Sequence, residues 1–261
     1  MQKGGIMSPI SPGYDYPNID AEEAINDRIC TEARVKAKLS PEFPDDLSCE
    51  EGCLLWNNGC PFTNRGTSPK TKFINLLIDT DRKNMPEFIT YLTSETDFFN
   101  APASSNSHGN YKGGLLEHSL IVHENLVKII NLFNLEVDPN TIIITSLLHD
   151  LCKANFYKAD TKNVKNKKGQ WEKVPYFSID DETPLGHGEK SALILQRYIQ
   201  LTMEELMAIR WHMAGFDDAA RNYSGGLSLN NAMNKYPLIA ILHMADLAAV
   251  NLREKVVGGV I

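Results

Sequence analysis

Residues 138–154, with the sequence DPNTIIITSLLHDLCKA, decide the fold of this chain. Asp138 is a good N-cap, and Pro139 fits the first turn of a helix. The β-branched run TIIIT would also suit a strand, but the apolar spacing continues through SLLHDLCK for two further turns. We therefore predict a buried helix that reaches about Ala154.

The pair His149-Asp150 lies near the end of this predicted helix. A buried carboxylate without a partner is costly, so Asp150 needs a counter-charge, a cap or a metal ion. Adjacent residues on a helix point about 100° apart, so both side chains reach one centre only if it lies beside the helix. From this pair alone, a salt bridge, a helix cap and a metal site all remain open.

The sequence on both sides of this stretch is also mainly helical in pattern. His118 interrupts the apolar face of a helix predicted from Leu115 to Phe133. Thr202 and Glu205 form a capping box. The other predicted elements are helices from Asp20 to about Leu39, from Asn84 through EFITYLT, from His187 onward, from Thr202 to about Met213 and from Pro237 to about Glu254, and a hairpin between Phe156 and Ile179.

The composition is that of an ordinary globular protein. Of 261 residues, 43% are hydrophobic and 23% are charged, which excludes a mostly disordered, collagen-like or coiled-coil protein. We predict an all-α bundle over residues 67–261 with a small inserted β-hairpin. Residues 1–66 are predicted to form an appendage of an arm, a helix and a loop. Cys49, Cys53 and Cys60 in that loop are too loosely spaced for a strong zinc signature, so free or packed thiols are favoured over zinc.

Charge and hydropathy limit the partners of the chain. It has 26 basic and 33 acidic residues and a net charge of −7, whereas a protein that coats nucleic acid is usually basic. The longest apolar run, from Leu238 to Val250, is too short to span a membrane. Five cysteines, an odd number, favour reduced thiols. We predict a cytoplasmic protein that acts on a small phosphorylated molecule and has no membrane partner, with short nucleic acid as a further candidate.

Four more polar residues stand on predicted helices where they need an explanation: His118, His187, His212 and Asp246. Asp246 is the most informative, because its helix is apolar nearly all round. Taken singly, each has an ordinary explanation as a buried histidine bonded to a carbonyl, a solvated helix start or a buried ion pair.

Together with His149-Asp150, these residues supply enough ligands for two divalent cations. The set has four imidazoles, two carboxylates and no thiolate, which argues against a closed structural zinc site. Asp150 could bridge the cations and leave positions open for water and substrate. Two cations and two carboxylates leave a charge of about +2, which suits a phosphoryl group. The predicted ligands are His118, His149, Asp150, His187, His212 and Asp246.

The order of these residues resembles that of the HD-domain metal-dependent phosphohydrolase superfamily in its two-metal form. HDLCK is similar to the HDIGK-type signature, with Cys152 in place of the usual glycine. HGNYKGGLLEHSL, at residues 108–120, resembles a segment of the branch that contains bacterial 3′-to-5′ exoribonucleases. Residues 1–69 show no OB-type strand domain of that branch, and the GYP-type signature of cyclic-dinucleotide phosphodiesterases is absent. The resemblance covers about residues 70–255.

The resemblance implies an HD-domain helical bundle and a role for each matching residue. A first metal would be held by His118, His149, Asp150 and Asp246. Asp150 would bridge to a second metal held by His187 and His212. A metal-bridging hydroxide would attack phosphorus in line, which places Asp150 among the catalytic residues. Fe, Mn, Co, Ni and Zn all tolerate these ligands.

Three further residues are candidates for catalysis, for substrate binding or for support of the ligands. Lys153 lies one turn after Asp150 and by similarity would contact the phosphate or the leaving oxygen; a solvated lysine at a helix end is the alternative. His108 and His243 are candidates for substrate binding or for positioning the ligands.

The predicted hairpin is rich in lysine, with aromatic residues among the lysines. It is interpreted either as a lid or rim that steers a polyanionic substrate and stacks a base, or as a solvated hairpin. Its lysines and aromatic residues are Lys158, Lys162, Lys165, Lys167, Lys168, Lys173, Trp171, Tyr176 and Phe177.

The expected function is that of a metal-dependent phosphohydrolase that cleaves a phosphomonoester or phosphodiester bond in a nucleotide or short oligonucleotide. The alternative is a catalytically silent HD module that binds a nucleotide and regulates a partner. The intact set of six ligands disfavours this alternative, because a silent module would have no need for them.

Overall fold

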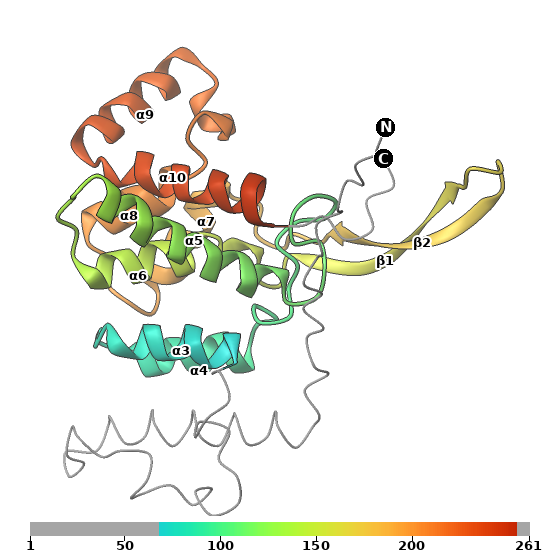
Figure 1. Cartoon of the computed structure of the whole chain (residues 1–261), viewed down its shortest axis with the longest axis horizontal. Coiled ribbons are helices and arrows are strands. Elements are labelled where there is room, and N and C mark those ends of the chain that lie inside the picture. Colours follow the sequence, from blue (N-terminus) through green and yellow to red (C-terminus); the bar gives the residue numbers. More distant parts are fainter. Residues whose placement is uncertain (1–67, 255–261) are drawn as a thin grey trace, which may run out of the picture. The chain divides into compact units, whose positions relative to one another are not determined.

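The computed structural model describes residues 68–254, which are drawn as the coloured ribbon in Figure 1. The predicted appendage at residues 1–66, with its helix from Asp20 to about Leu39 and its three cysteines, lies outside the described residues. The predicted domain boundary lies there too and stays a prediction. Across residues 68–254, no helix is both long and apolar enough to cross a membrane.

The described chain is an all-α bundle with one inserted hairpin, which confirms the predicted fold class. The hairpin leaves the bundle between α6 and α7, and Figure 1 shows it projecting away from the helices. The helices are α3 (Pro69–Asp79), α4 (Met85–Ser94), α5 (Gly114–Leu132), α6 (Pro139–Leu148), α7 (His187–Gln196), α8 (Met203–Trp211), α9 (Tyr223–Lys235) and α10 (Leu238–Ala248). The strands are β1 (Tyr157–Lys165) and β2 (Trp171–Ile179).

Local signals set the helix starts where they were predicted. The Asp138 side chain accepts a hydrogen bond from the backbone N–H of Asn140 at 2.8 Å and caps α6. At the start of α8, Thr202 and Glu205 make both bonds of a capping box. These short-range bonds fix the first turns independently of the rest of the fold.

Helix ends follow the sequence pattern less closely. The predicted helix to Ala154 ends at Leu148, and Leu151–Lys153 forms a separate 3₁₀ turn. The last helix, predicted as continuous to Glu254, changes at Ala249–Arg253 to a π-helical turn. Both departures lie next to candidate site residues, where such irregular turns are frequent.

Helix α9 has no counterpart in the predictions, because Gly225 and Gly226 in its first turns weaken the helical signal. The Asn222 side chain caps this helix by accepting from the backbone N–H of Gly225 at 2.8 Å. A Cβ at Gly225 would lie 1.7 Å from the carbonyl oxygen of Ala219. Glycine is therefore required by close packing at this position.

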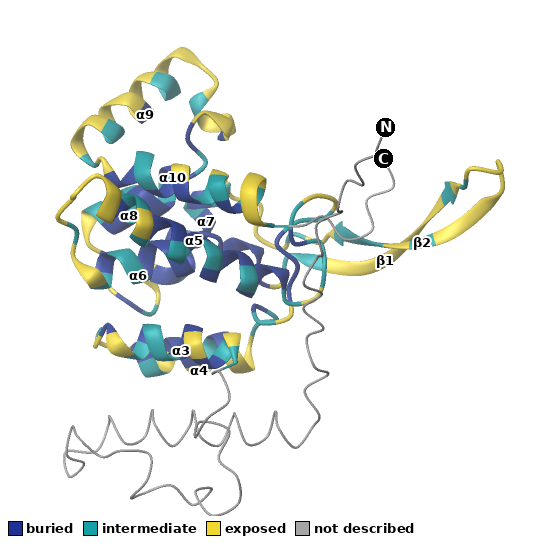
Figure 2. Ribbon diagram, viewed as in Figure 1, coloured by how far each residue is buried: buried dark blue, intermediate teal, exposed yellow. Residues whose placement is uncertain are grey.

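Two apolar clusters position the helices around the candidate site. The larger lies among α3 to α8 and includes Phe73, Phe88 and Leu147. The smaller joins α5, α8 and α10, with Leu126 and Leu242 fully buried. Figure 2 shows the buried residues concentrated in the helical bundle and the hairpin largely exposed. Helices α5, α6, α8 and α10 are therefore fixed against one another.

Candidate metal centre

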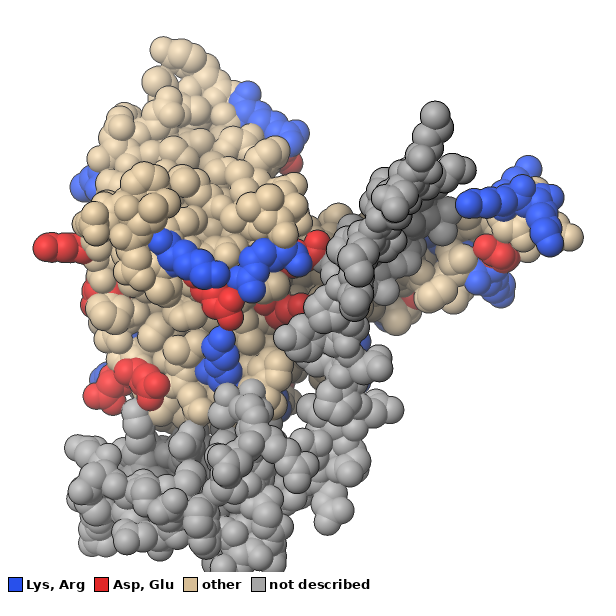
Figure 3. Space-filling model, viewed as in Figure 1, with Lys and Arg blue, Asp and Glu red and all other residues tan. Residues whose placement is uncertain are grey.

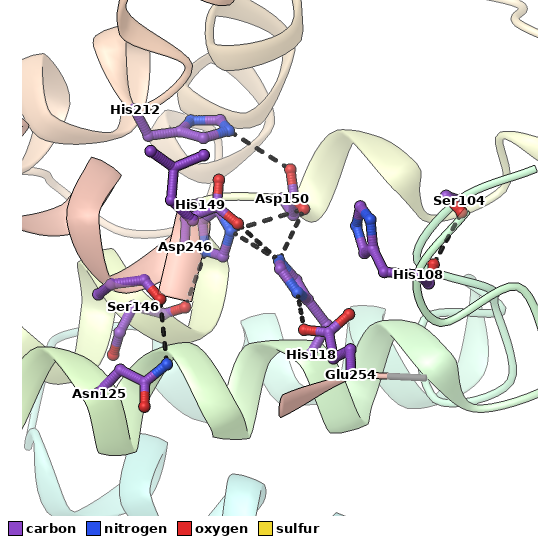
Figure 4. Close-up of polar contacts among 12 residues, drawn as sticks. Ser104, His108, His118, Asn125, Ser146, His149, Asp150, His212, Asp246 and Glu254 are labelled. Atoms are coloured by element: carbon purple, nitrogen blue, oxygen red, sulfur yellow. Dashed lines mark hydrogen bonds and ion pairs between the residues drawn. The ribbon is translucent and has the colours of Figure 1, made fainter. Parts of the chain in front are cut away.

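Asp150 is buried at the centre of a cluster of imidazoles and carboxylates (Figure 4). Its Oδ2 atom lies 3.3 Å from Nε2 of His118 and 3.5 Å from Nε2 of His149. Its Oδ1 atom lies 2.9 Å from Nε2 of His187 and 3.5 Å from Nε2 of His212. The two oxygens of one carboxylate therefore face two different pairs of imidazoles.

Asp246 supplies the second predicted carboxylate. Its Oδ1 atom lies 3.4 Å from Nε2 of His118. The Asn125 side chain on α5 donates to the backbone carbonyl of Ala245 at 3.1 Å and so fixes α10 beside α5. The structure thus brings all six predicted ligands together, while their role as metal ligands stays a prediction.

Close contact between α7 and α8 brings His187 and His212 to the same side of Asp150. A Cβ on Gly188, at the start of α7, would lie 2.2 Å from the carbonyl oxygen of Arg210. Only glycine allows this approach of the two helices. The backbone N–H of Cys152 also donates to the Ser191 side chain of α7 at 3.0 Å.

Three of the imidazoles are held with Nε2 directed into the cluster. Nδ1 of His149 donates to the carbonyl of Ser146 at 2.8 Å, and Nδ1 of His212 donates to the carbonyl of Ile209 at 2.7 Å. Nδ1 of His118 donates to Oε1 of Glu254 at 2.6 Å. These bonds direct each Nε2 toward the carboxylate oxygens, and Nε2 of His118 also lies 3.2 Å from Nε2 of His149.

A cation fits this arrangement. Nε2 of His212 is buried and has no hydrogen-bond partner among the described residues, although Oδ1 of Asp150 is 3.5 Å away. Two acceptors face each other there without a donor between them, which is unfavourable unless a cation binds both. Neutral imidazoles and carboxylates are ligands that suit divalent Fe, Mn, Co, Ni and Zn.

The pKa values show how the metal-free cluster balances its charge. Burial alone would lower the pKa of His118, but its bonds with Asp150 and Glu254 raise it to about 10. Burial lowers the pKa of His149 to about 3. Without metal, His118 is therefore protonated and His149 is neutral. Metal binding would displace the proton from His118, because an imidazole binds metal in its neutral form.

Lys153 is buried, and its Nζ atom lies 2.6 Å from Oδ2 of Asp150. The alternative of a solvated lysine is therefore wrong. Burial alone would raise the pKa of Asp150, but Lys153 and the surrounding imidazoles hold it well below its usual range. Lys153 keeps the central carboxylate ionised.

His108 and His243 have different positions. The His108 ring lies 5.4 Å from the His118 ring, and burial and the charge of Lys153 lower the pKa of His108. His108 therefore borders the cluster as an unprotonated imidazole. Nδ1 of His243 donates to the backbone carbonyl of His212 at 2.7 Å. His243 thus supports the chain at His212.

Two residues of the cluster were not predicted as site residues. Glu254 is almost fully buried against His118, and the π-helical turn places it there, with its backbone N–H bonded to the carbonyl of Ala249 at 3.0 Å. No helical spacing in the sequence indicates such a turn. Cys152, noted in the sequence only as a replacement for glycine, places its sulfur within 4.8 Å of ligand atoms of Asp150 and His187.

The core of this helical bundle holds imidazoles and carboxylates around one aspartate, an arrangement that could hold metal and that defines a helical protein with a candidate histidine–aspartate centre. The sequence profile of the HD domain matches residues 115–249, just over half of the chain, and the chain therefore belongs to the HD-domain family. The predicted superfamily is confirmed, while the likeness to the exoribonuclease branch stays a prediction.

One curated relative is the dihydroneopterin 2′,3′-cyclic phosphate phosphodiesterase of Methanocaldococcus jannaschii. It is 32% identical over 87 residues, which are 32% of this chain and 32% of the relative. The chain thus spans about a third of the length of that relative. No solved structure matches the chain significantly.

Proposed function

We propose that this chain is a metal-dependent phosphohydrolase whose active site is the cluster of imidazoles and carboxylates around Asp150. The observation that carries this proposal is the division of partners between the two oxygens of Asp150, with His118 and His149 on one side and His187 and His212 on the other. A carboxylate in this position suits a bridge between two cations. Membership of the HD-domain family supports the proposal.

The residues of the cluster divide between two metal sites. His118, His149 and Asp246 would hold one cation, His187 and His212 would hold the other, and Asp150 would be shared. When bound, two divalent cations supply Lewis-acid stabilisation of phosphoryl charge and lower the pKa of a water molecule.

Lys153 and His108 are the proposed substrate-side groups. Lys153 is a buried cation next to Asp150, so it can contact a phosphate oxygen and stabilise charge on the leaving oxygen. Its long side chain also holds Asp150 in orientation. His108 is half-buried beside His118, a position that supports a role in hydrogen-bonding the substrate at the border of the cluster.

We propose a phosphodiester, in a nucleotide or short oligonucleotide, as the bond that is cleaved. The named activity of the archaeal relative is that of a cyclic phosphate phosphodiesterase, which favours a diester over a monoester. A silent nucleotide-binding module remains the competing function. The arrangement of acceptors without a donor between them disfavours it, because that arrangement serves metal binding.

The test is a metal analysis followed by hydrolysis assays on the full chain. The protein, loaded separately with Mn, Fe, Co, Ni or Zn, is assayed with an aryl phosphate diester, an aryl phosphate monoester, cyclic nucleotides and short RNA. We expect bound metal and diester turnover that a chelator removes. Protein that neither binds metal nor hydrolyses any of these compounds would support the silent module.

A Lys153→Met variant tests the assignment of the lysine. We expect it to retain metal and lose most of its turnover, because a group that acts on substrate is removed while the six ligands remain. Lys128→Met, at an exposed position of α5, is the matched control and should change neither. Loss of metal from the Lys153 variant would instead assign Lys153 a role in forming the metal site.

A further inference from the structure

The hairpin formed by β1 and β2 carries a charge opposite to that of the rest of the chain. Between Tyr157 and Ile179 there are six lysines and two acids, a net charge of +4. The whole chain has a net charge of −7, so the remaining residues together carry −11. Figure 3 shows lysine side chains gathered at the outer end of the hairpin.

The strand register places Trp171 and the two acids of the hairpin on opposite faces. Successive residues of a strand point to opposite faces, and β1 pairs with β2 so that Lys165 lies opposite Trp171 and Asp160 lies opposite Tyr176. The face with Trp171, Lys165 and Lys173 (the aromatic face) carries no carboxylate, since both acids lie on the other face. The contact of Lys165 Nζ with the Trp171 ring, 5.2 Å from its centre, agrees with this alternation.

Trp171 is the most informative residue of the hairpin. It is 67% exposed at the end of a two-stranded arm. An exposed indole offers an aromatic surface on which a base can stack, and lysines surround this one in the sequence. We call Lys165, Lys167, Lys168, Trp171 and Lys173 the tip.

We propose that the tip binds single-stranded nucleic acid and docks it for cleavage at the candidate metal centre, an inference that rests on the proposed function. Lysines bind the phosphates of a single strand, and an exposed aromatic ring stacks on its unpaired bases. An acidic protein would use the lysines without the indole. An anionic lipid surface could use both, so the single strand is favoured because the hairpin begins a few residues after Asp150 and Lys153 of the candidate phosphohydrolase site.

The length of the hairpin determines which substrates can use the tip. Strands of nine residues are about 30 Å long. The hairpin begins at Tyr157, only a few residues after Asp150 and Lys153. A mononucleotide is much shorter than the hairpin, so only an oligonucleotide could contact both the tip and the cluster around Asp150. The tip therefore selects substrates by length.

The first experiment measures binding of a fluorescent single-stranded RNA, and of the matching DNA, by anisotropy at several salt concentrations. The tip variant Lys165→Glu/Lys167→Glu/Lys168→Glu should bind at least about tenfold more weakly, with the slope of log K against log salt reduced by about 2. The control Lys83→Glu/Lys128→Glu/Lys235→Glu changes three exposed lysines of the helical bundle and should keep the slope of the original chain. Equal slopes for the two triple variants would overturn the proposal.

Trp171→Ala separates stacking from charge. We expect its affinity for the single strand to fall roughly ten- to hundredfold with an unchanged salt slope, because a neutral ring is removed. Polyglutamate and vesicles that contain phosphatidylserine are tested as competitors. If they displace RNA from the tip and Trp171→Ala has no effect, the tip is a general polyanion surface and the proposal is wrong.

The second experiment separates failure of this inference from failure of the proposed function. The ratio of kcat/KM for an oligonucleotide to kcat/KM for an aryl phosphate diester should fall in the tip variant and not in the control. Binding that depends on the tip, without hydrolysis of any substrate, would support the binding role of the tip and overturn the proposed phosphohydrolase activity. Hydrolysis with the same ratio of kcat/KM values in all variants would overturn only the proposed role of the tip.

Discussion

Two lysine–aspartate ion pairs lie in opposite environments, one buried and one exposed. Lys153 and Asp150 lie 2.6 Å apart in the buried cluster, with side chains 9% and 3% exposed. Lys158 and Asp180 lie 3.2 Å apart at the base of the hairpin, with side chains 73% and 60% exposed. Removal of one partner from a buried pair leaves an uncompensated charge, whereas water and salt screen an exposed pair. Burial, rather than residue type, decides which pair belongs to the site.

The largest effect is expected for Asp150→Asn. This substitution removes the charge shared by the two groups of imidazoles. Turnover should fall on the order of 10³-fold or more, because several kcal/mol of charge stabilisation is lost. Bound metal, measured by elemental analysis of the same sample, should fall with it. Asp180→Asn on the exposed pair is the matched control and should keep both, and an Asp150 variant with full metal content would contradict the shared role.

Removal of metal should make the stability of the folded protein depend on pH. The pKa of His118 is raised from its usual value near 6.5 to about 10, and that of His187 is raised in the same direction. Their contribution is fully present below about pH 6.5 and is lost as the pH rises toward 10. The melting temperature of chelated protein should therefore fall between about pH 6.5 and pH 9. Metal-loaded protein should lack this decline, since metal replaces the proton.

An intermediate effect is expected for Glu254→Gln. The carboxylate that accepts from Nδ1 of His118 is replaced by a neutral amide, so His118 becomes a weaker ligand. Metal affinity should fall roughly 10- to 100-fold, as is usual for such supporting carboxylates. Competition with a chromophoric chelator measures this. Glu124→Gln, at an exposed position that pairs with Lys72 and Arg253, should leave metal affinity unchanged, and equal affinities in both variants would exclude the role of Glu254.

The smallest effect is expected for Lys158→Met on the hairpin. The free energy of unfolding in urea should change by less than about 1 kcal/mol, because exposed ion pairs contribute little. The change should shrink further at high salt. A loss of several kcal/mol would show that the exposed pair contributes to stability as a buried pair does. That result would contradict the contrast drawn between the two pairs.

Much of this architecture could be predicted from the sequence because its signals are local. The cap at Asp138 and the capping box at Thr202 need only neighbouring residues. The six polar residues could be selected because a carboxylate or imidazole on an apolar helix is costly without a partner. The hairpin was recognisable from its β-rich pattern between two helices.

Other features depend on contacts between distant segments. The chain after Leu148 is bonded to a distant helix, with the backbone N–H of Cys152 donating to the Ser191 side chain of α7. Glu254 reaches His118 only because a π-helical turn redirects the chain after α10. No periodic pattern encodes that turn, so the partner of His118 could not be predicted. The resemblance already grouped His187 with His212, but their position at one oxygen of Asp150 depends on the close packing of α7 against α8.

The open edges of the hairpin have a consequence for its chemistry. A two-stranded ribbon leaves unpaired backbone donors and acceptors along both outer sides, and these can recruit strands of other molecules into aggregates. Charged side chains and Pro175 within β2 counter this tendency. Charge of either sign protects such an edge, but only positive charge attracts phosphate. A tip converted to glutamates should therefore remain monodisperse while its preference for polyanions disappears.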